Sequence, residues 1–176
     1  MGSLRVALEL ARNDHGGRKL STFLSTYSNK VDRKGRVSVP AAYRAALSGG
    51  TFQGVIAYPS LTGRAIEAFG REMLERMNQE RFTRSMEGGA FEDVLLGGGD
   101  DSAVETVMAM AREMPFDGEG RIILPAALCD HAGIGERAVF VGRGTRFQIW
   151  APEAYERRQA EEIEKLQRRL NGGGAS

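Results

Sequence analysis

The chain has 176 residues, of which 41% are hydrophobic and 27% charged, and its formal net charge is +1, a composition that supports a folded core and excludes a wholly disordered chain. With one cysteine and two histidines it can form neither an internal disulfide nor a metal centre rich in these residues, so no metal is predicted. Because it has no apolar run of about 18 residues and no signal-like leader, we expect a cytoplasmic protein without a membrane partner.

The predicted elements begin after residues 1–22, which we expect to form a flexible extension. Residues 23–31 are rich in aromatic, Ser/Thr and Val side chains and predict a strand that enters a turn at residues 32–35. In this turn Asp can accept a backbone hydrogen bond two residues on, and Gly tolerates a positive φ. A short strand follows, then a helix over residues 40–47 opened by its proline, and a strand over residues 54–59.

An amphipathic helix is predicted over residues 65–82, where apolar side chains recur at spacings of three and four. The side chains expected on its core face are Ile66, Phe69, Met73 and Met77. The following segment is rich in Gly and Asp and predicts a connector, interrupted by a helix over residues 103–112.

The second half is predicted to repeat this order, with a turn at residues 117–120, a strand, a short helix and two strands. Cys129 and Trp150 are expected in the core. A long helix then begins at Pro152 and carries a narrow apolar seam, formed by Tyr155, Gln159, Ile163, Leu166 and Leu170. A seam this narrow is typical of a helix that packs on a neighbour.

The two turns belong to one repeated motif. DRKGRVSVPAA at residues 32–42 recurs as DGEGRIILPAA at residues 117–127, 85 positions later. Both copies share Asp, Gly, Arg, Pro and two Ala at the same places, and their apolar positions match. We therefore expect two copies of one structural unit.

The two copies differ in charge. Residues 18–44 hold seven basic side chains and one acidic, a net charge of +6, whereas residues 92–119 hold eight acidic side chains and one basic, a net charge of −7. A cluster of cations attracts a polyanion such as DNA. The first copy is therefore predicted to bind DNA.

Cations in or beside the first turn are the predicted DNA contacts, namely Lys30, Arg33, Lys34 and Arg36. We expect Lys30 and Lys34 to hold phosphates and Arg36 or Arg33 to read guanine. Alternatively, Arg36 is a fold-stabilising partner of Asp32. Arg121 is a fifth candidate, but Asp117 and Glu119 compensate its charge, which favours a structural role.

Other residues are predicted to shape the turns, namely Asp32, Gly35, Asp117 and Gly120. Each Asp is expected to cap its turn and to pair with the Arg four residues on. Arg137, Arg143 and Arg146 are weaker candidates for a second basic surface on the neighbouring strands. No Ser or Cys nucleophile has an evident paired base, so we predict no enzyme activity, no catalytic residue and no cofactor.

The repeated Asp-x-x-Gly-Arg pattern and its surroundings resemble the MraZ family of bacterial transcriptional regulators over roughly residues 23–166. The most specific stretches are FLSTYSNKVDRKGRVSVPAAYRAAL and MPFDGEGRIILPAALCDHAGI. The resemblance implies an α+β, mainly β fold in which two tandem SpoVT-AbrB-type swapped-hairpin units form a small β-barrel core with flanking helices. The implied divisions are units at residues 26–72 and 110–153, a helix and connector at residues 73–109, and a C-terminal helix and end at residues 154–176.

The resemblance also implies a function. Members bind short G-rich direct repeats in double-stranded DNA upstream of the division and cell wall gene cluster, as ring-shaped homo-oligomers, here an octamer or larger, in the nucleoid. Two alternatives remain: an antitoxin of the AbrB superfamily, and a structural oligomer that does not read DNA sequence. Such antitoxins usually carry one copy of the unit and a disordered tail, whereas this chain carries two copies and a helix.

Overall fold

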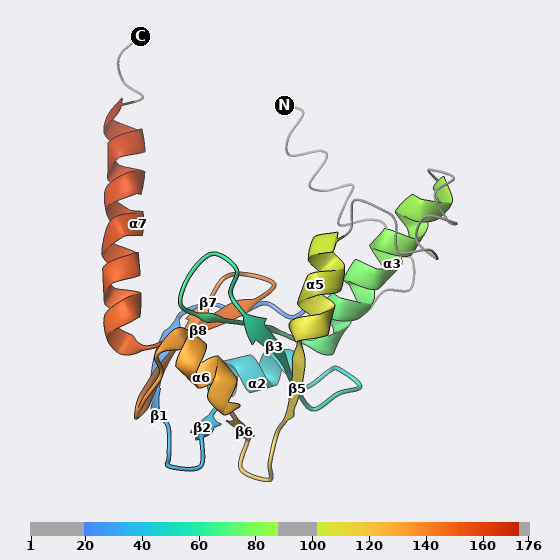
Figure 1. The fold of residues 1–176 in the computed structure, drawn as a ribbon, viewed down its shortest axis with the longest axis horizontal. Helices are drawn as coiled ribbons and strands as arrows, with labels where there is room; N and C mark the ends of the chain where they lie inside the picture. The colour runs from blue at the N-terminus through green and yellow to red at the C-terminus, as the bar shows by residue number, and fades with distance from the viewer. Residues whose placement is uncertain (1–19, 88–101, 173–176) are drawn as a thin grey trace.

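The computed structural model describes residues 20–87 and 102–172, and the predicted extension over residues 1–22 lies almost wholly outside this part. The fold is α+β with mainly strands, and helices flank an open antiparallel sheet (Figure 1). The prediction of an α+β, mainly β chain is therefore confirmed at this level.

The two halves contain the same elements in the same order. The first half comprises β1 (Thr26–Lys30), β2 (Arg36–Ser38), α2 (Ala41–Leu47), β3 (Gly54–Pro59), β4 (Ile66–Phe69) and α3 (Arg71–Glu87). After the added helix α5 (Ser102–Met110), the second half comprises β5 (Arg112–Pro115), β6 (Arg121–Ile123), α6 (Ala126–Ala132), β7 (Arg137–Gly142), β8 (Phe147–Trp150) and α7 (Pro152–Gly172).

Strands of the two halves are exchanged across the main sheet, whose order is β1-β7-β8-β4-β3-β5. β1 of the first half pairs with β7 of the second, and β5 of the second half pairs with β3 of the first. β4 and β8 pair at the centre of the sheet, and β2 pairs with β6 in a separate two-stranded ribbon. Each half supplies an edge strand to the other, so the halves form one folded unit.

An aromatic cluster joins the two halves in the core. Tyr43 on α2 is only 1% exposed, and its ring centroid lies 5.3 Å from that of Phe23 and 5.0 Å from that of Phe147 on β8. Phe140 on β7 also contacts Tyr43, edge to face. The Tyr43 hydroxyl donates a 2.7 Å hydrogen bond to the carbonyl of Ser25. The residue therefore contributes both apolar contact area and a satisfied polar group.

The predicted helix over residues 65–82 is wrong at its start. Ile66–Phe69 form the buried strand β4, and α3 begins at Arg71 after Gly70. A strand buried on both faces lacks the apolar–polar alternation, so two apolar residues at a spacing of three resembled one helix face. Phe69 lies in the core as predicted, whereas Met73 and Met77 are only half-buried.

Strand β5 is absent from the sequence prediction. The predicted helix over residues 103–112 ends at Met110, and Arg112–Pro115 pair with β3 at the edge of the sheet. Only Met114 of this strand is buried, which gives it too weak a pattern to be recognised. Trp150 is buried as predicted, but Cys129 is only half-buried.

Helix α7 begins at Pro152, as predicted, and extends away from the sheet (Figure 1). At its start Tyr155 packs on Trp150, with ring centroids 6.4 Å apart. Further along, the seam residues Ile163, Leu166 and Leu170 are exposed. Within the described residues, therefore, only the beginning of the predicted seam is covered.

Candidate nucleic-acid interface

The first turn, residues 32–36, is held by its aspartate. Oδ1 of Asp32 accepts 2.9 Å hydrogen bonds from the backbone N–H groups of Lys34 and Arg36. Oδ2 accepts a 2.6 Å hydrogen bond from Nε of Arg36. These contacts, led by the backbone hydrogen bond from Arg36, lower the pKa of Asp32. The turn is thereby held in one conformation before any partner binds.

The second turn, residues 117–121, has the same geometry. Oδ1 of Asp117 accepts 2.9 Å hydrogen bonds from the backbone N–H groups of Glu119 and Arg121, and Oδ2 accepts one of 2.7 Å from Nε of Arg121. The backbone hydrogen bond from Arg121, followed by the side-chain hydrogen bond, lowers the pKa of Asp117 to about 2. The shared sequence motif therefore corresponds to a shared turn structure.

Glycine is required in the first turn for two reasons. Gly35 has a φ of 77°, in the left-handed region that residues with a Cβ rarely adopt. A Cβ at this position would also lie 2.8 Å from the carbonyl oxygen of Leu124 at the end of β6. The missing side chain lets the first turn approach the strand that leads out of the second.

The two turns lie side by side. The backbone N–H of Leu124 donates to the carbonyl of Gly35 at 2.9 Å, and that of Val39 donates to the carbonyl of Gly120 at 3.1 Å. These bonds continue the β2–β6 ribbon, and both turns project from the same edge of the molecule (Figure 1). One partner surface can therefore meet both turns.

Exposed cations lie on the first turn and at the end of β1, which leads into it. The side chains of Lys30, Arg33 and Lys34 are exposed, and within residues 20–87 and 102–172 none of the three forms an ion pair. Three unpaired cations beside a turn already held by other contacts add nothing evident to the stability of the fold. They leave positive charge available for an external anion.

The two motif arginines differ in how much of the guanidinium is occupied. Arg36 contacts Asp32 through Nε alone in the described part of the chain, which leaves its terminal nitrogens unused. Arg121 contacts Asp117 through Nε and Glu119 through Nη1 at 2.8 Å. The hydrogen bond to Asp117 and the charges of nearby carboxylates raise the pKa of Arg121. Arg36 is therefore better placed than Arg121 to bind another molecule.

Two further cations lie beside the turns. Arg137 on β7 is the register partner of Lys30 and donates to the hydroxyl of Ser28. Arg44 on α2 donates to the carbonyl of Val39, and its guanidinium lies against Gly120 of the second turn. Nothing in the sequence indicates this position of Arg44, because it depends on the pairing of β2 with β6.

The three arginines predicted to form a second basic surface do not lie together. Arg137 stands at the start of β7, beside the first turn, whereas Arg143 follows the end of that strand. Arg143 is paired with Glu162 at 3.0 Å and Arg146 with Glu67 at 3.1 Å. These two arginines belong to a separate polar cluster.

The described residues show little sign of other chemistry. Residues 20–87 and 102–172 contain no group of three or more His, Cys, Asp or Glu side chains placed to hold a metal ion. Burial, together with the charge of Asp130, raises the pKa of the Cys129 thiol, which makes it a poor nucleophile. None of the helices in this part of the chain is long and apolar enough to cross a membrane.

The stability of the turns should fall with pH in the acid range. A carboxyl group whose pKa is lowered by folding stabilises the protein above its unfolded pKa, and this contribution is lost as the pH falls through the folded pKa. For Asp117 that interval runs from about pH 4 down to about pH 2. We expect the thermal midpoint to fall across this interval, and Asp117→Asn to lower the midpoint at neutral pH and to flatten the fall.

Circular dichroism melts at steps of half a pH unit test this expectation. The matched control is Asp130→Asn, which removes an exposed carboxyl group from α6. It should follow the pH profile of the parent protein. An Asp117→Asn profile as steep as the parent's would show that the carboxylate does not stabilise the turn.

Comparison with known proteins gives a consistent match. Residues 107–171 match the family model described as "MraZ protein, putative antitoxin-like". The chain is 44% identical over 154 residues to the transcriptional regulator MraZ of Rickettsia akari (strain Hartford), an alignment that covers 85% of this chain and 95% of that protein. It is 45% identical over 141 residues to the protein of the same name in Rickettsia peacockii (strain Rustic), covering 78% of this chain and 87% of that protein.

The Rickettsia bellii (strain OSU 85-389) protein of that name is 43% identical over 140 residues, covering 77% of this chain and 85% of that protein. An alignment that covers 85% of the 176 residues must span both copies of the motif. The resemblance noted in the sequence is therefore confirmed: the chain belongs to the MraZ family.

Proposed function

We propose that this protein is a sequence-specific DNA-binding transcriptional regulator. The observation that carries the proposal is the first turn, held by Asp32 and Gly35. Among the described residues, Arg33 and Lys34 on this turn and Lys30 at the end of β1 are exposed and form no ion pair. The names of the Rickettsia relatives, transcriptional regulators, support the same conclusion. The proposed setting is the cytoplasm, in association with the nucleoid.

The proposed contacts follow from geometry. The major groove of B-DNA is about 12 Å wide and admits a two-stranded β-ribbon, the element to which both turns are attached. We propose that Lys30 and Lys34 hold phosphates and set the register, while Arg36 or Arg33 presents its planar guanidinium to guanine. Arg121 is a secondary contact, because two carboxylates already occupy it.

Self-association is the second part of the proposal. A few phosphate contacts per subunit bind weakly at cellular salt, whereas subunits linked in a ring bind successive repeats with much higher avidity. The exposed seam on α7, at Ile163, Leu166 and Leu170, supplies apolar surface for such an assembly. We propose a ring-shaped homo-oligomer, an octamer or larger, that binds short G-rich direct repeats upstream of the division and cell wall gene cluster.

The domain organisation is proposed on the same basis. The exchange of β1 and β5 between the halves supports two tandem SpoVT-AbrB-type swapped-hairpin units, at residues 26–72 and 110–153, around a small barrel-like core. The helix and connector at residues 73–109 then join the units, and residues 154–176 form the helical end.

Fluorescence anisotropy tests the reading of sequence. We expect the parent protein to bind a duplex of G-rich direct repeats at least about tenfold more tightly than a scrambled duplex. Arg36→Ala should lower the affinity for the direct-repeat duplex about tenfold. Arg121→Ala is the matched control, because it removes the same side chain from the same turn geometry, and it should cost less. Equal affinity for both duplexes would contradict the proposal.

The two rival functions are distinguished by separate experiments. In a purely structural oligomer, Arg36→Ala would break the assembly in size-exclusion chromatography with light scattering, whereas in a DNA-binding ring it leaves the assembly intact. An antitoxin function is the second candidate, favoured by the words "antitoxin-like" in the family description. It requires that a toxin partner co-purifies with the protein.

A further inference from the structure

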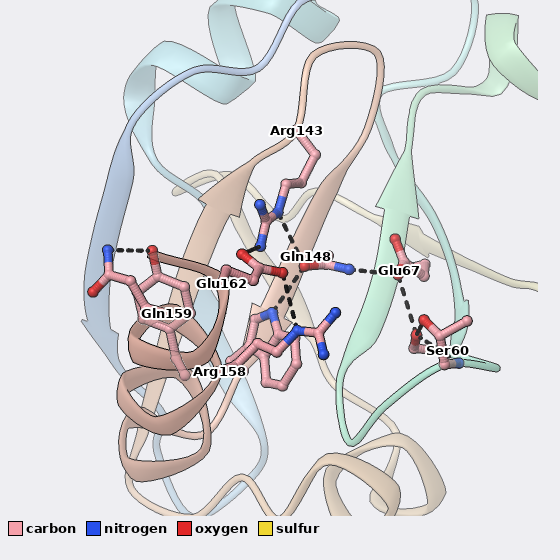
Figure 2. A network of polar contacts seen from close by, with 10 residues as sticks. Ser60, Glu67, Arg143, Gln148, Arg158, Gln159 and Glu162 are labelled. Atoms are coloured by element: carbon pink, nitrogen blue, oxygen red, sulfur yellow. Dashed lines mark hydrogen bonds and ion pairs between the residues drawn. The ribbon is translucent and has the colours of Figure 1, made fainter. Parts of the chain in front are cut away.

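A polar cavity of about 200 Å³ lies between the β3–β4 connection, the β7–β8 hairpin and α7. Its floor is formed by Glu67 and Gln148, which are register partners on the central strands β4 and β8. They are 5% and 9% exposed. Figure 2 shows Arg143, Arg158 and Glu162 gathered on one side of this pair, with Ser60 on the other. A charged and an amide side chain are thus buried where the two halves of the chain meet.

The floor of the cavity is fully hydrogen-bonded. Oε1 of Glu67 accepts a 2.6 Å hydrogen bond from Nε2 of Gln148 and a 3.2 Å bond from the hydroxyl of Ser60. Oε1 of Gln148 accepts a 3.1 Å bond from the indole N–H of Trp150. A buried polar network with all partners present is stable and rigid. The floor therefore needs no ligand in order to fold.

The rim carries more positive than negative charge. Glu162 on α7 accepts 3.0 Å bonds from Nη2 of Arg143 and from Nε of Arg158. Burial raises the pKa of Glu162, but the two arginines outweigh this effect and leave the pKa lowered. Nε of Arg146 contacts Glu67 at 3.1 Å. Three guanidinium groups thus face two carboxylates, and the cavity has a net charge of about +1.

Two of these guanidinium groups have N–H donors without a partner among the described residues. Among the described residues, the terminal nitrogens of Arg146 and Arg158 make no hydrogen bond, although both side chains line the cavity. Figure 2 shows the end of Arg158 directed toward the side of the cavity where Glu67 and Ser60 lie. A planar fork of N–H donors at a cavity with excess positive charge is suited to an oxyanion.

We propose that this cavity binds a phosphate group, held by the terminal nitrogens of Arg146 and Arg158. Its volume is below the range of about 300–1,000 Å³ that is usual for whole drug-sized ligands, so it takes one phosphate group rather than an entire nucleotide. The ligand is either free phosphate or the phosphate of a small phosphorylated metabolite. This site is independent of the DNA-binding turns and does not rest on the proposed function.

Binding has a structural consequence for α7. Arg158 belongs to α7 and Arg146 to the β7–β8 hairpin, so a shared phosphate fastens the helix to the sheet. A ligand that binds only the folded state raises the thermal midpoint. Phosphate would in this way stabilise the helix that we propose for self-association.

Trp150 provides a local reporter, because it lines the cavity and is the only tryptophan in the chain. Titration of the full-length protein with inorganic phosphate and, separately, with glycerol phosphate, at constant ionic strength, should give a saturable change in Trp150 fluorescence. Saturation by inorganic phosphate identifies free phosphate as a ligand, and tighter saturation by glycerol phosphate identifies a phosphorylated metabolite. If neither ligand changes the Trp150 fluorescence more than sodium chloride does, the proposal is wrong.

Variants locate the binding. Arg158→Gln should weaken phosphate binding about tenfold, because it removes charged donors. Arg146→Gln should act in the same direction, and both should retain the circular dichroism spectrum of the parent. Arg168→Gln, an exposed position on the same helix, should bind like the parent. An Arg33→Ala/Lys34→Ala protein should also keep the change in Trp150 fluorescence on addition of phosphate. If this protein alone loses that change, phosphate binds at the first turn and not in the cavity.

Discussion

Replacing Arg33 and Lys34 together with alanine is expected to weaken binding to a direct-repeat duplex by about a hundredfold, with the fold intact. Hydrogen bonds to charged groups each contribute about 1.5–3 kcal/mol, so even at the lower end of this range two lost contacts amount to about two orders of magnitude in affinity. Both side chains are exposed and neither forms an ion pair in the described part of the chain, so their removal costs the folded state little.

Anisotropy measured at several salt concentrations tests this expectation. Each phosphate contact contributes about 0.9 to the slope of log affinity against log salt, so the double variant should lose a slope of up to about 1.8. The matched control is Arg64→Ala with Arg157→Ala, which removes the same charge from exposed positions on the β3–β4 connection and α7. If the control weakens binding as much as the turn variant, net charge and not the turn governs binding.

Tyr43→Ala is expected to cost about 3–5 kcal/mol of unfolding free energy, a large share of the roughly 5–15 kcal/mol typical of a folded protein. Tyr43 is almost fully buried, and its ring contacts aromatic side chains from both halves, including Phe23 and Phe147. Removing the ring leaves a cavity between α2 and the strands of the second half. The variant should therefore unfold at a clearly lower urea concentration than the parent protein.

Urea denaturation followed by circular dichroism measures this loss. Tyr43→Phe is the matched control, since it keeps the ring and loses only the 2.7 Å hydrogen bond to the carbonyl of Ser25. It should cost about 1 kcal/mol. A Tyr43→Ala protein with the same urea midpoint as Tyr43→Phe would show that the aromatic cluster does not hold the halves together.

The strongest sequence signals were short and local. The Asp-x-x-Gly-Arg spacing predicts a turn because an Asp oxygen reaches the backbone N–H two residues on, and Asp32 and Asp117 both make that contact. Pro152 indicates the start of α7 because its missing N–H is not needed there. The motif also identified the family, since two matched copies at a fixed distance are rare by chance.

Prediction failed where burial removed the local signal. Ile66–Phe69 are buried throughout, and the sequence pattern alone could not distinguish this strand from a helix. The phosphate cavity was not visible either, because Glu67 and Gln148 are 81 residues apart in the chain and meet only through the pairing of β4 with β8.

By itself, the sequence determined the two turns, the starts of the short helices and of α7, the uneven charge of the two copies and the family. Only the tertiary structure decided that β1 pairs with β7 and β5 with β3, and that the turns lie side by side. It also decided that, within the described residues, Arg36 uses only Nε whereas Arg121 uses Nη1 as well, for Glu119. The reason is physical. Turns and helix ends depend on contacts within a few residues, whereas strand exchange and shared cavities depend on which distant apolar faces bury one another.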